Sequence, residues 1–172
     1  IGVSRGLGDV YKRQEYYVQI DSTAFDDSSS NSYAGISDKT TYSFTTADET
    51  APVVSSVSPA DNATAVATNS NFVLNFSEAV DVETGNIVIY KASDDSVVET
   101  IDVTSSQVTG TGSTQITINP SSDLAEQTEY YVQIAATAFD DSSSNSYAGI
   151  SDTTSLSFTT ADETNPSLSS SS

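Results

Sequence analysis

The chain has 172 residues, which is enough for one domain or for one domain with part of another. Its 24 acidic and 5 basic residues give a formal charge of −19 at pH 7, and a surface this negative repels nucleic-acid phosphates and anionic membranes. Cys, His, Met and Trp are absent. The composition therefore excludes disulfides, thiolate nucleophiles, Cys-based zinc sites and the usual general base at neutral pH.

The first 14 residues differ in character from the rest of the chain. Residues 1–14 (IGVSRGLGDVYKRQ) hold three of the five basic residues and resemble a translated adapter sequence that contaminates some assembled reading frames. We therefore predict that residues 1–14 are not native and leave them out of the fold argument. Elsewhere, no apolar run approaches the length of about 18 residues that indicates a membrane-spanning helix.

An internal repeat is the strongest signal in the sequence. The segment from Glu15 to Ser56 recurs from Glu129 to Ser170, an offset of 114 with eight differences and therefore 34 identities over 42 positions. Solenoid repeats run roughly 20–50 residues, whereas 114 residues suit a self-sufficient domain near the roughly 100 residues of an immunoglobulin-type sandwich. We therefore predict a tandem array of autonomous domains.

The repeat divides the chain at positions set by its period. Residues 15–50 are interpreted as the C-terminal part of a preceding repeat, 51–164 as a complete domain, and 165–172 as the start of the next repeat. Residues 15–46 would supply only the last two strands of their domain, and an isolated hairpin is marginal in water. We expect that segment to be poorly ordered or paired with an open sheet edge.

Within residues 51–164, apolar and polar residues alternate in short runs separated by turn-rich stretches such as SPADNAT, VETGN and TGTGS. This pattern predicts antiparallel strands with one buried face, and two such sheets packed face to face bury those faces most simply. The fold class is therefore predicted as all-β, a Greek-key sandwich. The predicted strands lie at residues 72–76, 87–90, 116–118, 130–134 and 156–158.

A local spacing supports the sandwich. Tyr130 follows Leu124 by six residues in LAEQTEYYVQI, the spacing of a tyrosine corner, in which the tyrosine hydroxyl bonds to the backbone before its strand. The alternative interpretation is that Tyr130 is an ordinary core aromatic. Both place it in a strand of the sandwich.

Several motifs in residues 51–162 resemble the bacterial Ig-like domains of the SbsA type. They are Pro52, the Pro59–Asp61 turn, Phe76–Glu78 with Val80, Tyr130–Val132 and Phe158–Thr160. Two departures, Asn62 and Ser144, stand where that family usually has Gly and put a left-handed backbone there in doubt. The resemblance implies an immunoglobulin-like repeat of S-layer or other bacterial surface proteins, and hence an extracellular or cell-surface location.

Two acidic regions are candidate calcium sites, because calcium takes six to eight oxygen ligands. The first is the loop FDDSSSNSYAGISD, repeated earlier in the chain by Asp26, Asp27, Asn31 and Asp38; the second is the linker TTADETAP with the Pro59–Thr64 turn. Neither has EF-hand spacing, so the alternative is a set of solvated acidic turns. The candidate ligands are Asp140, Asp141, Asn145 and Asp152 in the loop, and Asp48, Glu49 and Asp61 at the junction, where Asp162 and Glu163 repeat the motif.

The sequence argues against catalysis. Glu78 and Asp81 form a carboxylate pair of the kind that glycosidases use, but they fall in the FSEAVD segment that matches the resembled family. Lys91 is the only Lys within residues 51–164, and no His is present to activate a nucleophile. The chain is therefore predicted to need no cofactor and not to be an enzyme.

The predicted function is a structural spacer that presents distal domains of a bacterial surface protein, with adjacent repeats of the same chain as partners. Two alternatives stay open. One is a calcium-dependent adhesion module, and the other is a carbohydrate-binding module that uses Tyr90, Tyr131 and Tyr147 to stack on sugar rings. No nucleic-acid partner and no membrane insertion are expected, and the surface ligand of the parent protein is not given by the sequence.

Overall fold

The computed structural model describes residues 2–3 and 13–166, and every regular element in these residues is a β-strand. The chain divides between Thr50 and Ala51 into two compact units, which we call the first unit and the second unit. Parts of two predicted segments, residues 1 and 4–12 of the adapter-like stretch and residues 167–172 of the next repeat, lie outside the described residues.

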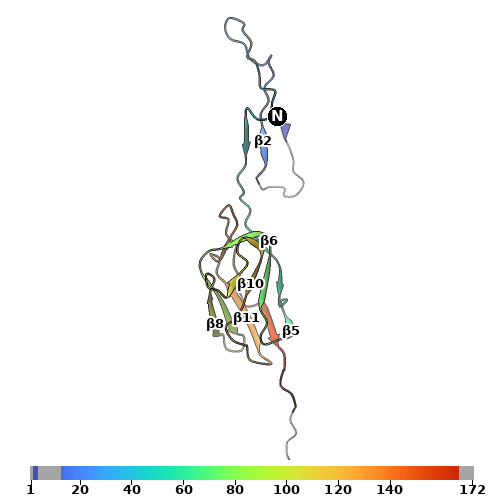
Figure 1. The fold of residues 1–172 in the computed structure, drawn as a ribbon, viewed down its shortest axis with the longest axis vertical. Helices are drawn as coiled ribbons and strands as arrows, with labels where there is room; N and C mark the ends of the chain where they lie inside the picture. The colour runs from blue at the N-terminus through green and yellow to red at the C-terminus, as the bar shows by residue number, and fades with distance from the viewer. Residues whose placement is uncertain (1, 4–12, 167–172) are drawn as a thin grey trace, which may run out of the picture. The chain divides into compact units, whose positions relative to one another are not determined.

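Two five-stranded sheets form the second unit (Figure 1). One has the order β12-β6-β10-β9, with β4 also paired to β6, and the other has the order β5-β13-β11-β7-β8. All pairs are antiparallel except β5 with β13. The predicted all-β sandwich is therefore confirmed. The strands of the first sheet are β4 (Val54–Ser58), β6 (Phe72–Val82), β9 (Val108–Thr109), β10 (Ser113–Ile118) and β12 (Phe139–Asp140); those of the second are β5 (Ala63–Val66), β7 (Asn86–Lys91), β8 (Ser96–Asp102), β11 (Glu129–Ile134) and β13 (Ser157–Thr160).

The chain crosses from one sheet to the other between β4 and β5. The peptide bond between Ser58 and Pro59 is cis at this crossing, and Asn62 follows with a φ of 58°. Ser144, the second position where Gly was expected, has a φ of 64°. Both residues therefore keep the left-handed backbone that the sequence put in doubt, although a side chain makes this conformation less favourable than it is for Gly.

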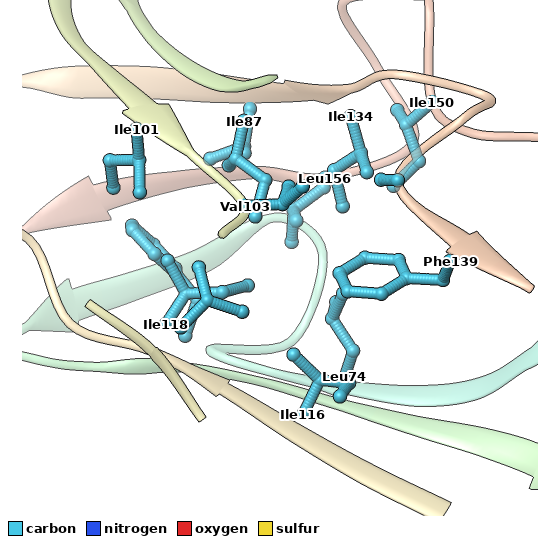
Figure 2. Close-up of a cluster of buried hydrophobic side chains, with 14 of the residues drawn as sticks. Leu74, Ile87, Ile101, Val103, Ile116, Ile118, Ile134, Phe139, Ile150 and Leu156 are labelled. Carbon is cyan, nitrogen blue, oxygen red and sulfur yellow. The ribbon is translucent and has the colours of Figure 1, made fainter. Parts of the chain in front are cut away.

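The core lies between the two sheets. Figure 2 shows Leu74 and Ile116 of the first sheet directed toward side chains of the second sheet, and Phe139, from β12 of the first sheet, lies in the same cluster. Aromatic pairs extend this packing, since the ring centroids of Phe72 and Phe158 are 5.4 Å apart and those of Phe76 and Phe139 are also 5.4 Å apart. Such pairs add to the gain from burying apolar area.

Tyr130 forms the predicted tyrosine corner. Its hydroxyl accepts a hydrogen bond of 3.0 Å from the backbone N–H of Ala125, and its ring stacks on Phe158 at 5.7 Å. Tyr130 is at the same time a core aromatic with 2% of its surface exposed. The two interpretations of this residue are therefore both correct.

The first unit is a hairpin built like the last two long strands of the second unit. Its strands β2 (Glu15–Tyr17) and β3 (Ser43–Thr45) pair Tyr16 with Phe44, and β11 and β13 pair Tyr130 with Phe158, the same register displaced by 114 residues. The bridge between Ile20 and Ile36 likewise repeats the one between Ile134 and Ile150. The strand β1 (Gly2–Val3) pairs with the free edge of β2.

The two hairpins differ in what covers their apolar side chains. In the first unit Phe25, Tyr33, Tyr42 and Phe44 expose 61%, 43%, 54% and 50% of their surface. Their counterparts 114 residues later, Phe139, Tyr147, Leu156 and Phe158, expose 0%, 7%, 2% and 1%. In the second unit, Phe72 and Phe76 of β6 pack against three of these rings, Phe158, Phe139 and Tyr147.

This contrast predicts unequal effects for the same substitution at equivalent positions. We expect Phe158→Ala to lower the free energy of unfolding of the second unit by about 3–5 kcal/mol, the usual cost of removing a buried Phe. Phe44→Ala, on the exposed hairpin, should change it by less than about 0.5 kcal/mol. Urea unfolding followed by the amide signals of the second unit measures both, and equal losses would contradict the described core.

Candidate functional site

The acidic loop after β12 is organised by Asp141. One carboxylate oxygen of Asp141 accepts hydrogen bonds of 2.8 Å from the backbone N–H groups of Ser143 and Asn145, and the other accepts one of 2.8 Å from the Asn145 side chain. Asp141 is 5% exposed. The structure therefore brings together two of the predicted calcium ligands, Asp141 and Asn145, as hydrogen-bond partners that close a turn.

Asp152 closes the next turn. Its two carboxylate oxygens accept hydrogen bonds from the backbone N–H and the hydroxyl of Thr154 and of Ser155, at 2.7–3.0 Å. These bonds, above all the one from the Ser155 hydroxyl, hold the pKa of the Asp152 carboxyl well below its usual range, because they stabilise the ionised form. Asp152, Thr154 and Ser155 therefore form a turn through hydrogen bonds among themselves.

The first unit repeats both turns. Asp27 accepts hydrogen bonds from Ser29 and Asn31, and Asp38 accepts four from Thr40 and Thr41. The Asn31 side chain is the main cause of a lowered pKa at Asp27, and the Thr41 hydroxyl plays that part at Asp38. In the first unit, too, each of these bonds joins residues no more than four positions apart.

Other acidic groups of the second unit lie near one another. A carboxylate oxygen of Glu78 lies within 4.8 Å of one of Asp141. Asp140 lies directly opposite Asp81 in the pairing of β12 with β6, and like charges opposite each other disfavour a sheet. Glu78 and Asp81, the carboxylate pair considered for glycosidase chemistry, therefore have different neighbours. Glu78 lies near Asp141 and, in the sequence, between the buried Phe76 and Val80, whereas Asp81 is exposed and lies opposite Asp140.

The predicted junction residues take part in separate hydrogen-bond networks. Asp61 accepts bonds of 3.0 and 3.1 Å from the N–H and the hydroxyl of Ser157, which ties the turn before β5 to the start of β13. Asp48 lies in the first unit and accepts a bond of 3.1 Å from the N–H of Thr50, and Glu49 is exposed. A calcium site at the junction stays a prediction.

The segment after β13 is bound to the body of the second unit by contacts that the sequence did not predict. Both carboxylate oxygens of Glu163 accept hydrogen bonds from the buried Thr68, at 3.3 and 2.8 Å. The Thr164 hydroxyl donates a bond of 2.6 Å to Glu126, and Gln127 donates one to Asp162. Thr68 and Glu163 are 95 residues apart, so no local pattern pointed to this contact.

The tyrosines weighed as a sugar platform pack against other parts of the second unit. The rings of Tyr90 and Tyr131 stack on each other at 4.8 Å, and the Tyr131 hydroxyl donates a bond of 3.2 Å to Asp95. Tyr147 is 7% exposed and meets Phe76 edge-on at 5.3 Å. Burial raises the pKa of the Tyr147 hydroxyl. One face of the Tyr90 and Tyr131 rings is thus already occupied.

Comparison with known proteins identifies the fold family. The family model for the bacterial Ig-like domain matches residues 48–160. The chain belongs to the bacterial Ig-like domain family. A solved structure of the S-layer protein rSbsC is similar over 65% of this chain and 14% of that protein's chain, with 17% identity and a TM-score of 0.43. No curated protein matches. The finer resemblance to the SbsA type stays a prediction.

Residues 2–3 and 13–166 of this Ig-like chain contain no helix with the length and apolarity needed to traverse a bilayer.

The turn bonds of Asp152 predict an acid-sensitive fold. A carboxyl whose pKa is lowered by folding stabilises the protein above its unfolded pKa of about 3.9, and that stability is lost as the pH falls toward the folded pKa. We expect Asp152→Asn to lower the unfolding temperature of the second unit at about pH 6, with the difference from the native chain shrinking between about pH 5 and pH 2. Thermal unfolding across this range measures the effect.

Asp38→Asn is the matched control for that experiment. It removes the equivalent turn in the first unit and should leave the unfolding temperature of the second unit unchanged at every pH. A constant difference between Asp152→Asn and the native chain across the range would contradict the role given to the ionised carboxylate.

The calcium hypothesis stays a prediction and has a direct test. A ligand that binds only the native state must raise its stability, so bound calcium would increase the unfolding temperature at millimolar concentration. Magnesium at equal ionic strength controls for general screening of the negative charge. An unfolding temperature that is the same with both ions, or with calcium and with a chelator, would remove calcium from the description of this chain.

Proposed function

We propose that this chain is part of a structural spacer on a bacterial cell surface, in which Ig-like repeats in series hold other domains away from the cell. The observation that carries the proposal is the placement and anchoring of the two ends of the second unit. Figure 1 shows the chain entering this unit at one end and leaving it beyond β13 at the other. A unit with its termini at opposite ends adds length whenever it is repeated.

The N-terminal end of the second unit is fixed within a few residues of its start. Pro52 is buried, and Val53 exchanges two hydrogen bonds with Ser77, one from its N–H to the Ser77 hydroxyl at 3.1 Å and one from the Ser77 N–H to its carbonyl at 2.8 Å. Pro52 also has a restricted φ. Residues from Pro52 onward therefore belong to the body of the unit.

The C-terminal end is fixed in the same way. The N–H of Ala161 donates a bond of 2.7 Å to Val66, and the bonds of Asp162, Glu163 and Thr164 described above follow directly. By the repeat period, Asn165 and Pro166 correspond to Ala51 and Pro52. In an array, one residue would remain unanchored between consecutive repeats, and such a short connection favours an extended chain.

The strand arrangement suits a chain under tension. The first strands and the last strand of the second unit are joined through β5 and β13, which are parallel neighbours. A pull on the two ends in opposite directions loads the hydrogen bonds of a parallel pair together, whereas a pull at one end of an antiparallel hairpin breaks its bonds one after another. Each unit of this size spans about 40 Å, from strands of six to ten residues at about 3.3 Å each with their loops.

The charge of the chain agrees with this role. A net charge of −19 keeps neighbouring molecules apart and in solution. A secreted or cell-surface location, adjacent repeats as partners and a role that needs no catalysis or cofactor all belong to the proposal. Residues 15–50 are part of it as the C-terminal hairpin of a further repeat.

Single-molecule force spectroscopy on the full chain, held by its two termini, tests the spacer function. We expect Ala161→Pro to lower the unfolding force of the second unit, because proline lacks the N–H that bonds to Val66 beside the β5 and β13 pair. Asp152→Asn is the control, since it weakens a turn outside that pair. Equal unfolding forces for the native chain and Ala161→Pro would contradict load bearing by these strands.

A further inference from the structure

Strand β5 contains one more residue than its partner β13 over the stretch in which the two are paired. Ala63 lies opposite Phe158 and Val66 lies opposite Thr160, so two residues of β5 stand against one of β13 between these pairs. This arrangement is a β-bulge, which leaves the extra residue without a partner of its own. The backbone shows where the bulge lies, because Ala65 has a φ of 56°.

The bulge determines which side chains of β5 reach the core. Ala63 and Val66 are both partly buried and pack against the core, whereas Thr64 and Ala65 between them are exposed. In a regular strand, residues three apart face opposite sides of the sheet, because side chains alternate along the strand. The left-handed backbone at Ala65 therefore allows both Ala63 and Val66 to face inward.

This backbone conformation is unfavourable for Ala65. In the left-handed region the Cβ atom comes too close to the following carbonyl oxygen, and a bulge with this geometry usually has Gly for that reason. The Ala65 side chain is exposed, so its methyl group gains nothing from burial that would offset the strain. The strand therefore holds a strained residue at the position on which its packing depends.

Two groups of hydrogen bonds lie on either side of the bulge. Before it, the N–H of Asn62 donates a bond of 2.8 Å to the carbonyl of Ser157, whose N–H and hydroxyl bond to Asp61 as described above. After it, the bonds of Ala161 and Glu163 join the next residues of the chain to the segment that follows β13. The bulge thus lies in the middle of the contact between the first and the last part of the second unit.

We propose that Ala65 lowers the force at which β5 separates from β13 when the chain is pulled at its ends. The proposal rests on the spacer function, in which the load passes through this parallel pair. Pulling straightens β5 toward the regular extended conformation, which has a negative φ. Ala65 loses its strain as the strand straightens, and this release favours separation of the two strands.

Single-molecule force spectroscopy on the full chain tests the proposal with Ala65→Gly. Gly adopts the left-handed backbone without a Cβ clash, so this variant keeps the bulge and removes its strain. We expect the unfolding force of the second unit to rise and its unfolding rate at a given force to fall several-fold. Without load, the unfolding temperature of the second unit should rise by about 2–5 °C.

Ser144→Gly is the matched control. Ser144 is exposed, has a φ of 64° and lies in the loop after β12, outside the pair of β5 with β13. The same substitution should therefore raise the unfolding temperature there too, but leave the unfolding force unchanged. Equal gains in force for the two variants, or a force that Ala65→Gly does not raise, would overturn the proposal. A lower unfolding temperature for Ala65→Gly would also overturn it, because Ala65 would then carry no strain.

The Ala161→Pro chain separates this proposal from the spacer function on which it rests. If Ala161→Pro lowers the unfolding force and Ala65→Gly does not change it, the load path stands and the role of Ala65 is wrong. If neither substitution changes the force, β5 and β13 do not bear the load, and both the load path and the role of Ala65 are wrong. A lower force for Ala161→Pro together with a higher force for Ala65→Gly is the expected result.

Discussion

The second unit depends on the packing of one long strand, β6, against the hairpin that ends the repeat. Phe72 and Phe76 of β6 meet three aromatic rings of that hairpin, Phe158, Phe139 and Tyr147. These contacts join residues more than 60 positions apart in the chain, as the numbering in the sequence shows. The same hairpin sequence without β6, in the first unit, forms its turns and its register but leaves its rings in water.

Local interactions therefore determine the turns of this fold, and interactions between distant residues determine how its sheets pack. The turns close through the hydrogen bonds of Asp141 and Asp152 to neighbours within four residues, and both turns form equally well in the first unit. The sandwich closes through apolar contacts between strands that only the complete repeat contains. Part of the large negative charge thus belongs to carboxylates that accept hydrogen bonds within turns. Closing turns in this way is a second reason, besides ion binding, for a sequence to be rich in Asp.

The sequence predicted the strands that have one buried face and could not predict those that lack one. Residues 72–76, 87–90 and 130–134 alternate between apolar and polar side chains and are strands in the structure. β8 was missed because Val97 and Val98 are both exposed, which breaks the alternation. β4 and β5 were missed because neither strand contains a fully buried residue.

The geometry of the candidate site, like the exposed strands, could not be predicted from the sequence. Its acidic residues stand out in the sequence, but which of them meet depends on β6 and β12, as the closeness of Glu78 to Asp141 and the pairing of Asp81 with Asp140 show. The composition therefore indicated that acidic side chains would define the candidate site, but only the fold shows which of these side chains lie close to one another. The contact between Thr68 and Glu163 had no signal because one threonine among many gives no spacing to recognise.

The anchoring of residues 161–164 has a consequence for how such a protein changes over evolutionary time. The second unit secures the last residues of its ADET sequence to its own body, and the same four letters precede the second unit. In the proposed array, each repeat would therefore carry its own half of every connection. Unequal crossing-over between near-identical gene segments would then insert or delete whole units without altering any connection. The length of the molecule becomes a quantity that selection can adjust in steps of one repeat.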